Sequence, residues 1–440
     1  MGRWASVAVV ATAILIAGCA DPTGGDDVVA GTDGPAPSMR DVRSVGTADL
    51  DTADLDTADL DTAVRPVTVE SVDLELVATF ESAVDVVHHP LDGSMHVVEH
   101  AGRVVRLDGD GDAVVVLDIT DRLVGHDDEQ GLTGLEFAAD GRHAWIHHTP
   151  ADGATVVSEV AVDADGRFDV GSERVLIDIG GPPGNNHNGG DLLLRDDGTL
   201  LIAIGDGEAA IRVEGEAPIP TDDPHRHASD PTELRGSILR VRPTPDDAEP
   251  YAIPDDNPFA DGALTLDDGT EVAGAPEVLA WGLRNPWKIA VDQPSGTLWI
   301  ADVGSASAEE LNAVAPRDGR PAGWAADFGW SAFEGTDRRD ADVTPAGSDP
   351  VDPVHVYDHA DGRCAVSGGE VYRGDDVEGL RGGYVFADFC AGSVWVLDPT
   401  TGEERRIAEG IPGISAVRAG PDGELHVASW FGEVHRIVPA

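Results

Sequence analysis

The chain has 440 residues, of which 41% are apolar, and a net charge of −53 from 82 acidic and 29 basic residues. Nucleic-acid binding requires Lys and Arg to neutralise phosphates, so this composition argues against a nucleic-acid partner. An acidic surface attracts divalent cations, although adaptation to a saline habitat is a simpler explanation. The 53 glycines and 29 prolines suit short strands and turns, and no long run has helical periodicity. The sequence therefore predicts an all-β protein.

Residues 1–19, MGRWASVAVVATAILIAGC, have the pattern of a secretory signal, with one arginine before an apolar stretch that is too short to span a membrane. The end of this segment resembles a bacterial lipobox. In that reading Cys19 is lipidated and becomes the mature N-terminus, whereas the alternative is an ordinary cleavable signal. We expect an exported protein, lipid-anchored to the cell envelope, that contacts the membrane only through this N-terminal lipid.

Residues 20–74 differ in composition from the rest of the chain. The run GTADLDTADLDTADLDTA repeats the unit Thr-Ala-Asp-Leu-Asp, which is too acidic and too poor in apolar residues to bury a core. We expect a disordered acidic tether whose like charges repel one another and extend it.

From residue 75 onward, a turn with glycine followed by a strand recurs six times. One such motif per sheet predicts a six-bladed β-propeller of four-stranded antiparallel blades over residues 75–440. The last segment, GELHVASWFGEVHRIVPA, is expected to share a blade with the early LELVATF and so close the ring. A β-sandwich with long loops is the alternative. The six motifs are DGSMHVVEH, DGRHAWIHH, DGTLLIAIG, SGTLWIADV, GGYVFADFC and DGELHVASW.

Polar residues stand where several of the apolar strands begin or end. In GNNHNGGDLLL, His187 lies among turn residues just before an apolar run, and Asp206 in AIGDGE follows another apolar strand. Further along, WGLRNPW contains Arg284 and Asn285, and LWIADVGSASAEELN ends a strand at Asp302. Each stretch is weak evidence alone, because such residues are common in ordinary turns.

In combination these stretches are much more specific. The order NHNGG, GDG, DPTELRGSILRV, YAIPDDNPF, WGLRNPW, LWIADVG, FGWSAFEG, VSGGEVYRG and YVFADFCAG resembles the glucose/sorbosone dehydrogenase family over residues 75–440. The resemblance implies a six-bladed propeller that uses pyrroloquinoline quinone (PQQ) held by calcium to oxidise a sugar. The family also includes hedgehog-interacting-protein-like members, for which catalysis is not assured.

The resemblance also implies roles for individual residues. His187 corresponds to the general base that takes the proton of the sugar C1 hydroxyl, a task suited to an imidazole. Arg284 corresponds to the cation beside the quinone carbonyl, where it stabilises the charge that develops during hydride transfer. Asp206 is expected to orient the base or a sugar hydroxyl.

The remaining implied roles concern the cofactor. Asn285 and Glu129, the latter in DEQGLTGLEF, correspond to polar contacts of the quinone. Gly304 and Ser305 match the turn whose backbone carbonyls hold calcium, an ion that prefers hard oxygen ligands. Together they imply a PQQ and calcium site on the rim of the propeller.

Cys364 and Cys390 remain after Cys19 is assigned to the lipobox. An export signal implies an oxidising compartment, where an even pair of cysteines usually forms a disulfide. Two free buried thiols are the alternative. The stretches CAVSGGEVYRG and FADFCAG resemble a bacterial branch of the family in which these two cysteines pair.

Two departures from the family pattern weaken the cofactor assignment. Residues 414–417, Ile-Ser-Ala-Val, stand where the enzymes present arginines to the cofactor carboxylates, and Arg418 is displaced from that position. The family's lysine near SGG has no counterpart, because Lys288 is the only lysine in the chain. Loss of cations weakens the binding of a tricarboxylate. The leading hypothesis is an aldose dehydrogenase; the alternatives are a non-catalytic propeller that binds a carbohydrate or protein, and a calcium-dependent lactone hydrolase.

Overall fold

The computed structural model describes residues 66–440 except 109–110, 125–128, 182–184, 208, 212–218, 222–225, 246, 267–268 and 347–349. The signal segment, Cys19 and most of the tether lie outside these residues. The described part is all-β, with two single-turn 3-10 helices, η1 (Ala360–Gly362) and η2 (Glu378–Leu380). Within it, no helix is long and apolar enough to cross a membrane.

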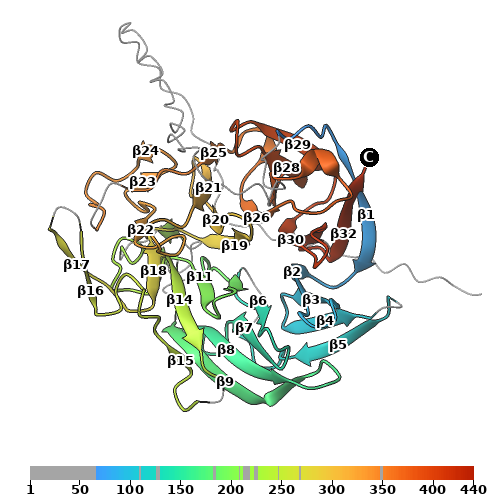
Figure 1. Cartoon of the computed structure of the whole chain (residues 1–440), viewed down its shortest axis with the longest axis horizontal. Helices are drawn as coiled ribbons and strands as arrows, with labels where there is room; N and C mark the ends of the chain where they lie inside the picture. Colours follow the sequence, from blue (N-terminus) through green and yellow to red (C-terminus); the bar gives the residue numbers. More distant parts are fainter. Residues whose placement is uncertain are drawn as a thin grey trace, which may run out of the picture.

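Six antiparallel sheets surround a common axis and form the predicted six-bladed propeller (Figure 1). The first three blades follow chain order. Blade 1 contains β2 (Ala83–His88), β3 (Met95–Glu99), β4 (Arg103–Leu107) and β5 (Ala113–Asp118). Blade 2 contains β6 (Leu132–Phe137), β7 (His143–His148), β8 (Thr155–Val162) and β9 (Phe168–Gly180). Blade 3 contains β10 (Leu192–Leu194), β11 (Leu200–Ile204), β14 (Ser237–Pro243) and β18 (Val278–Trp281).

The other three blades complete the circle. Blade 4 contains β19 (Pro286–Asp292), β20 (Thr297–Asp302), β21 (Glu309–Val314) and β25 (His355–Tyr357). Blade 5 contains β26 (Val366–Val371), β27 (Tyr384–Asp388), β28 (Ser393–Leu397) and β29 (Glu404–Glu409). Blade 6 contains β30 (Ile414–Ala419), β31 (Leu425–Ser429), β32 (Glu433–Pro439) and β1 (Val72–Thr79).

Blade 3 and the loops carry additional short strands. In blade 3, β22 (Ala326–Asp327) adds in parallel to β18, and β15 (Tyr251–Ala252) pairs with β14. Three small hairpins lie outside the blades. They are β12 (Ala209–Ile211) with β13 (Ile219–Thr221), β16 (Ala263–Thr265) with β17 (Glu271–Ala273), and β23 (Phe333–Glu334) with β24 (Asp337–Arg338).

The six glycine-led motifs supply the second strand of each blade, as predicted: β3, β7, β11, β20, β27 and β31. The turn before each strand requires a glycine in the left-handed region, where a Cβ atom is strained. In the motif GGYVFADFC, Gly382 with φ 88° takes this conformation instead of Gly383. The other five turn glycines have φ between 65° and 78°: Gly93, Gly141, Gly198, Gly296 and Gly423.

The ring closes as predicted by pairing of the early strand with the last one. Strand β1 runs antiparallel to β32, with Val72 opposite Pro439 and Thr79 opposite Glu433. Residues before 75 belong to the packed structure, because Val67 and Val69 pack against the core between blades 5 and 6. Closure gives the last blade its fourth strand and pairs the edge that β32 would otherwise leave open.

The first strand of each blade lines the axis, and the first strands of neighbouring blades contact one another. Apolar clusters fill the space between blades, for example Val84 and Val98 of blade 1 against Leu132 and Leu135 of blade 2. In an antiparallel blade the start of the first strand and the end of the second strand lie at the same end. The residues that precede β10 and β19 therefore share one rim with those that follow β11 and β20.

Candidate active site

His187 and Asp206 meet on this rim, as the sequence predicted. His187 lies on the loop before β10, Asp206 follows β11, and His187 Nδ1 is 2.6 Å from Asp206 Oδ1. Both residues are buried, with exposed fractions of 5% and 1%. With Asp206 ionised, Nδ1 donates to the carboxylate, so the basic lone pair of the imidazole is on Nε2. This pairing gives a fixed imidazole the orientation that a general base requires.

The backbone around this pair is tightly constrained. His187 has φ 54°, in the left-handed region that few residues other than glycine adopt. The Gly207 N–H donates to the His187 carbonyl at 3.1 Å, and the Asp206 N–H donates to the Arg284 carbonyl at 2.8 Å. The Asp206–Arg284 backbone hydrogen bond therefore joins the loops of blades 3 and 4 beside the His187–Asp206 pair.

Asn285 and Glu129 join the same cluster. The Asn285 side-chain amide donates to the two Glu129 carboxylate oxygens at 3.1 and 3.2 Å. Asn285 Oδ1 accepts the Gly189 N–H at 3.2 Å, and Glu129 Oε2 accepts the Asn188 N–H at 3.3 Å. Both predicted cofactor contacts thus hold the loop that carries His187.

Arg284 is positioned by Asp302, for which the sequence suggested no role. Asp302 accepts the backbone N–H groups of Arg284 and Asn285 at 2.9 and 2.6 Å. Burial raises the pKa of Asp302 to about 7, against the lowering effect of these hydrogen bonds. Arg284 Nη1 donates to the carbonyls of Val303 and Gly304 at 3.0 and 2.6 Å. The guanidinium is therefore fixed against the turn predicted to hold calcium.

Glu334, also unassigned from the sequence, organises that turn. Its Oε1 accepts the backbone N–H groups of Ser305, Ala306, Ser307 and Ala308 at 2.8–3.2 Å. Burial raises the pKa of Glu334, but these N–H groups outweigh it and hold the pKa below its usual value. A Cβ atom on Gly304 would lie 1.6 Å from the Ala308 carbonyl oxygen, so only glycine fits there. The N–H groups face Glu334, while the Gly304 carbonyl faces Arg284.

Trp330 connects the two halves of the site. Its indole Nε1 donates to Asp206 Oδ2 at 2.9 Å, which leaves Oδ1 for His187. The guanidinium carbons of Arg284 and Arg339 lie 5.6 and 4.6 Å from the centre of its ring. Sequence reasoning noted FGWSAFEG but assigned no role to Trp330 or Arg339. In that stretch, the only sequence feature that could have indicated a functional role was an aromatic residue followed by a polar turn.

Sequence comparison decides the family. The sequence profile described as Glucose / Sorbosone dehydrogenase matches residues 80–432.

The chain belongs to the glucose/sorbosone dehydrogenase family.

Among curated relatives, the HIPL1 protein of Arabidopsis thaliana is 30% identical over 237 residues, covering 49% of this chain and 30% of that protein. The aldose sugar dehydrogenase YliI of Escherichia coli is 28% identical over 263 residues, covering 58% and 60%. The matched region thus spans less than two thirds of either relative. The crystal structure of the soluble aldose sugar dehydrogenase of Escherichia coli, in the apo form, covers 84% of this chain and 100% of that one. Its TM-score is 0.61 at 22% identity, which supports the fold.

Two cations, Arg418 and Lys288, lie on the axis, whereas residues 414–417 carry none. Arg418 on β30 donates to both carboxylate oxygens of Asp85 at 2.8 and 3.0 Å, and also pairs with Asp191. Lys288 Nζ donates to Asp85 at 2.9 Å. A Cβ on Gly368, in the SGG stretch, would lie 2.2 Å from the Lys288 Cβ. A lysine therefore does pack against SGG, from β19 of the neighbouring blade, but it is already paired with a carboxylate.

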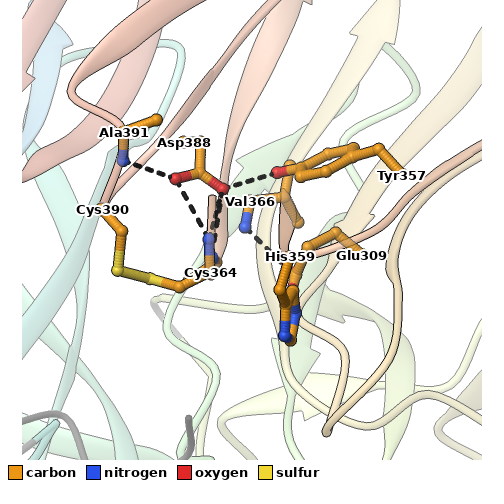
Figure 2. The surroundings of a disulfide bond; sticks show 9 residues. Glu309, Tyr357, His359, Cys364, Val366, Asp388, Cys390 and Ala391 are labelled. Atoms are coloured by element: carbon orange, nitrogen blue, oxygen red, sulfur yellow. Dashed lines mark hydrogen bonds and ion pairs between the residues drawn. A yellow bond between two sulfur atoms is a disulfide. The ribbon is translucent and has the colours of Figure 1, made fainter. Parts of the chain in front are cut away.

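The predicted disulfide of this glucose/sorbosone dehydrogenase family member is confirmed. Cys364 and Cys390 are bonded, with their Cα atoms 5.5 Å apart (Figure 2). The bond joins the segment before β26 to the end of β27. Beside it, Asp388 accepts the backbone N–H groups of Cys364, Ala365 and Ala391 and the Tyr357 hydroxyl, at 2.9–3.1 Å.

No cluster of three or more His, Cys, Asp or Glu side chains arranged to hold a metal occurs within the described part of the chain. The calcium ligands predicted from the sequence are backbone carbonyls, those of Gly304 and Ser305, and the Gly304 carbonyl accepts Arg284 Nη1 at 2.6 Å. The structure brings every other predicted rim residue of the site, from Glu129 to Asn285, into one hydrogen-bonded cluster beside this turn.

Proposed function

We propose that this chain is an exported, lipid-anchored quinoprotein that oxidises the anomeric C1 hydroxyl of an aldose. One observation carries the proposal: a buried His187–Asp206 pair stands in one contact network with the Arg284 guanidinium. Removal of a hydroxyl proton together with hydride transfer requires an oriented base and a fixed cation. Attachment to the envelope through Cys19 is part of the proposal and rests on the signal-like segment alone.

The residues present fit calcium and PQQ by their donor chemistry. The carbonyls of Gly304 and Ser305 are hard oxygen donors of the kind that calcium takes. Glu334 collects the N–H groups of the turn, and the Gly304 carbonyl already accepts Arg284 Nη1 at 2.6 Å, so calcium would have to share this oxygen with the guanidinium. Arg284 and Asn285 are the polar side chains that would hold the quinone. When bound, calcium-held PQQ would supply the hydride acceptor that no side chain provides.

The chain's own residues would act as follows. His187 Nε2 takes the proton of the C1 hydroxyl while the C1 hydrogen leaves as hydride, and the sugar becomes a lactone. Asp206 stabilises the imidazolium that forms, and Trp330 holds the other carboxylate oxygen in place. Arg284 stabilises the negative charge that develops at the hydride acceptor. Glu129 and Asn285 keep the His187 loop in position.

A second function has specific support. Arg418 and Lys288 are already paired with Asp85 and Asp191. Few cations on the axis are therefore available to bind the carboxylates of the quinone, which favours a protein without bound cofactor. In this alternative the rim binds a carbohydrate or a protein partner without catalysis, and His187 is a relic.

Titration of the purified protein with PQQ in the presence of calcium, followed by absorbance and by equilibrium dialysis, separates these functions. We expect binding at micromolar concentrations and quinone-dependent aldose oxidation with an artificial electron acceptor. Absence of binding would establish the non-catalytic function. Lactone hydrolysis with calcium alone would establish a hydrolase.

The loaded enzyme then tests the role of His187. We expect His187→Ala to lower kcat by about 10²-fold or more, the usual contribution of a positioned base. Quinone affinity should change much less, because His187 holds no cofactor atom in the proposal. His435→Ala, on β32, the third strand of blade 6, is the matched control and should leave both quantities unchanged. Equal kcat in the two variants would remove His187 from the reaction.

A further inference from the structure

Glu309, the first residue of β21, is fully buried although none of the site contacts described above involves it. Its Oε2 accepts the Gly304 N–H at 3.2 Å and the Val366 N–H at 3.0 Å. His359 Nε2 donates to its Oε1 at 2.8 Å, since a carboxylate can only accept. One carboxylate thus contacts both the turn before β21 and the first residue of β26 in the next blade (Figure 2).

Glu309 holds the connection between blades 4 and 5, residues 358–365, at both of its ends. His359 lies near the start of this connection, just after β25, and Val366 directly follows it. Burying a carboxylate is costly unless hydrogen bonds compensate, and here the compensating donors come from two blades. Glu309 therefore ties the connection to the turn that precedes β21.

The disulfide fastens the same connection near its C-terminal end. Cys364 is bonded to Cys390, and Asp388 accepts the N–H groups of Cys364 and of the next residue, each at 3.1 Å. The N–H that follows, that of Val366, donates to Glu309. Three consecutive N–H groups are thus held by two buried carboxylates. The disulfide corner and the turn before β21 therefore form one hydrogen-bonded unit.

This support reaches the site through the peptide unit between Val303 and Gly304. A trans peptide is planar, so its N–H and its carbonyl point in opposite directions. The N–H of this unit donates to Glu309, and its carbonyl, that of Val303, accepts Arg284 Nη1 at 3.0 Å. Glu309 therefore orients a carbonyl that holds the guanidinium. The next carbonyl, that of Gly304, accepts the same Nη1 at 2.6 Å.

We infer that Glu309 is a positioning residue of the proposed site. It fixes the 303–304 peptide, and with it the Arg284 guanidinium and the predicted calcium turn, against the disulfide-fastened connection between blades 4 and 5. The inference rests on the proposed function, because the residues that Glu309 positions are those that would hold the quinone and calcium. It also gives the disulfide a role in the site, in addition to its effect on the stability of blade 5.

Amide hydrogen exchange of the ligand-free protein tests the contact without any cofactor. Exchange of the Gly304 and Val366 N–H groups is followed by NMR in wild type, Glu309→Ala and Glu309→Gln. Alanine keeps no acceptor, whereas glutamine keeps an oxygen that can accept both N–H groups. We expect exchange at both amides to be about tenfold faster or more in Glu309→Ala, the scale of a lost hydrogen bond, and close to wild type in Glu309→Gln.

Two further variants make this measurement specific. Glu424→Ala is the matched control, because Glu424 is a buried carboxylate of blade 6 that accepts the N–H groups of Asp375 and Asp376 at 2.8 and 2.9 Å. It should leave exchange at Gly304 unchanged. Cys364→Ser with Cys390→Ser releases the connection and leaves Glu309 in place. This double variant should also speed exchange at Gly304, and it provides the test if Glu309→Ala does not fold.

Titration of PQQ in the presence of calcium, followed by calorimetry, then measures the consequence for the site. Groups that orient the ligands of a metal typically contribute about 10–100-fold to its binding, so we expect Glu309→Ala to weaken PQQ binding about tenfold or more. Glu309→Gln should recover most of this loss, and Glu424→Ala should match wild type. The double cysteine variant should lose affinity in the same direction. Adding Glu309→Ala to it should cost little more, because both changes act through one segment.

The outcomes distinguish this inference from the proposed function. Unchanged exchange at Gly304 in both Glu309→Ala and the double cysteine variant would overturn the inference, as would faster exchange with unchanged PQQ affinity. An equal loss of affinity in Glu424→Ala would overturn it by showing a general effect of stability. A loss in Glu309→Gln as large as in Glu309→Ala would overturn it by showing that the charge matters and not the hydrogen bonds. A wild-type protein that binds no PQQ would overturn the proposed function, while the exchange rates would still decide whether Glu309 holds the turn.

Discussion

Gly205 lies where the loops that carry His187 and Asn285 approach each other. A Cβ atom at this position would lie 2.4 Å from the His187 carbonyl oxygen and 2.9 Å from Asn285 Oδ1. Real Cβ atoms do not come that close, so either the His187 backbone or the Asn285 side chain must move. The hydrogen bond between Asn285 and the Gly189 N–H would be disturbed at the same time.

We therefore expect Gly205→Ala to cost about 1–3 kcal/mol of unfolding free energy, the usual cost of overpacking, and to displace the His187 loop. Chemical denaturation and quinone titration would measure both effects. Gly181→Ala is the control, because a Cβ there meets no atom within 4 Å. If the two variants behave alike, the two loops do not meet tightly at Gly205.

The sequence was informative about individual residues where a polar side chain directly follows or precedes an apolar strand. His187, Asp206 and Arg284 were noticed in this way, and their roles came from the resemblance to the family. Asp302 stands in the same position after β20, but its role depends on the N–H groups of a neighbouring segment, which no pattern of side chains reveals. Trp330 and Arg339 come from a loop whose path is set by the β23–β24 hairpin and by parallel pairing of β22 with β18.

At the level of single elements, the disulfide stabilises the inner hairpin of blade 5. It closes a loop between positions 26 residues apart, next to the start of β26. Asp388 caps the same corner through backbone N–H groups on both sides of the bond. The disulfide and the Asp388 hydrogen bonds therefore stabilise this end of the hairpin independently.

Cys364→Ser with Cys390→Ser should lower the unfolding free energy by about 3 kcal/mol, the chain-entropy effect of a loop of this size. Urea denaturation of wild type with and without reductant should show the same difference. The double variant should not respond to reductant. Wild type that keeps its full stability after both thiols are shown to be free would contradict the prediction.

The repeated elements were predictable because each blade needs the same left-handed turn before its second strand. Ring closure was also predictable, from an unpaired early strand and an unpaired last one. The insertions were not: β12–β13, β16–β17 and β23–β24 are short hairpins without strong alternation, and the pairing of β22 depends on where blade 3 leaves an open edge. Tertiary context decides such pairings more than intrinsic preference does.

Across the whole molecule, the axis contains a series of charged groups buried along the first strands. At the end opposite the His187 rim, a cavity of about 320 Å³ is lined by Glu136, Glu370 and Arg418 among others. Burial raises the pKa of both Glu136 and Glu370 to about 8, although Arg418 lowers it. These two carboxyls bind protons more tightly in the folded chain than in the unfolded one. Their contribution to stability is thus complete at low pH and is lost as the pH rises through about 8.

Glu370→Gln should therefore reduce the loss of stability between pH 6 and pH 9, and should stabilise the protein at pH 9 by on the order of 1 kcal/mol relative to wild type. Thermal or urea unfolding across this pH range would measure the effect. Glu403→Gln, at an exposed turn, is the control and should follow the wild-type profile. An equal decline in Glu370→Gln and wild type would show that Glu370 is already ionised in the folded protein at neutral pH.

The pairing of β1 with β32 also sets an order of events during synthesis. Val72 leaves the ribosome long before its partner Pro439 exists, so the intervening blades can form while blade 6 still lacks a strand. During that interval β1 has no hydrogen-bonding partner, and Leu76 and Val77 remain more than 40% exposed even after pairing. Contacts between such distant segments form slowly, which lengthens the time for which an open edge is available to other chains. The strong negative charge keeps nascent chains apart until the ring is complete.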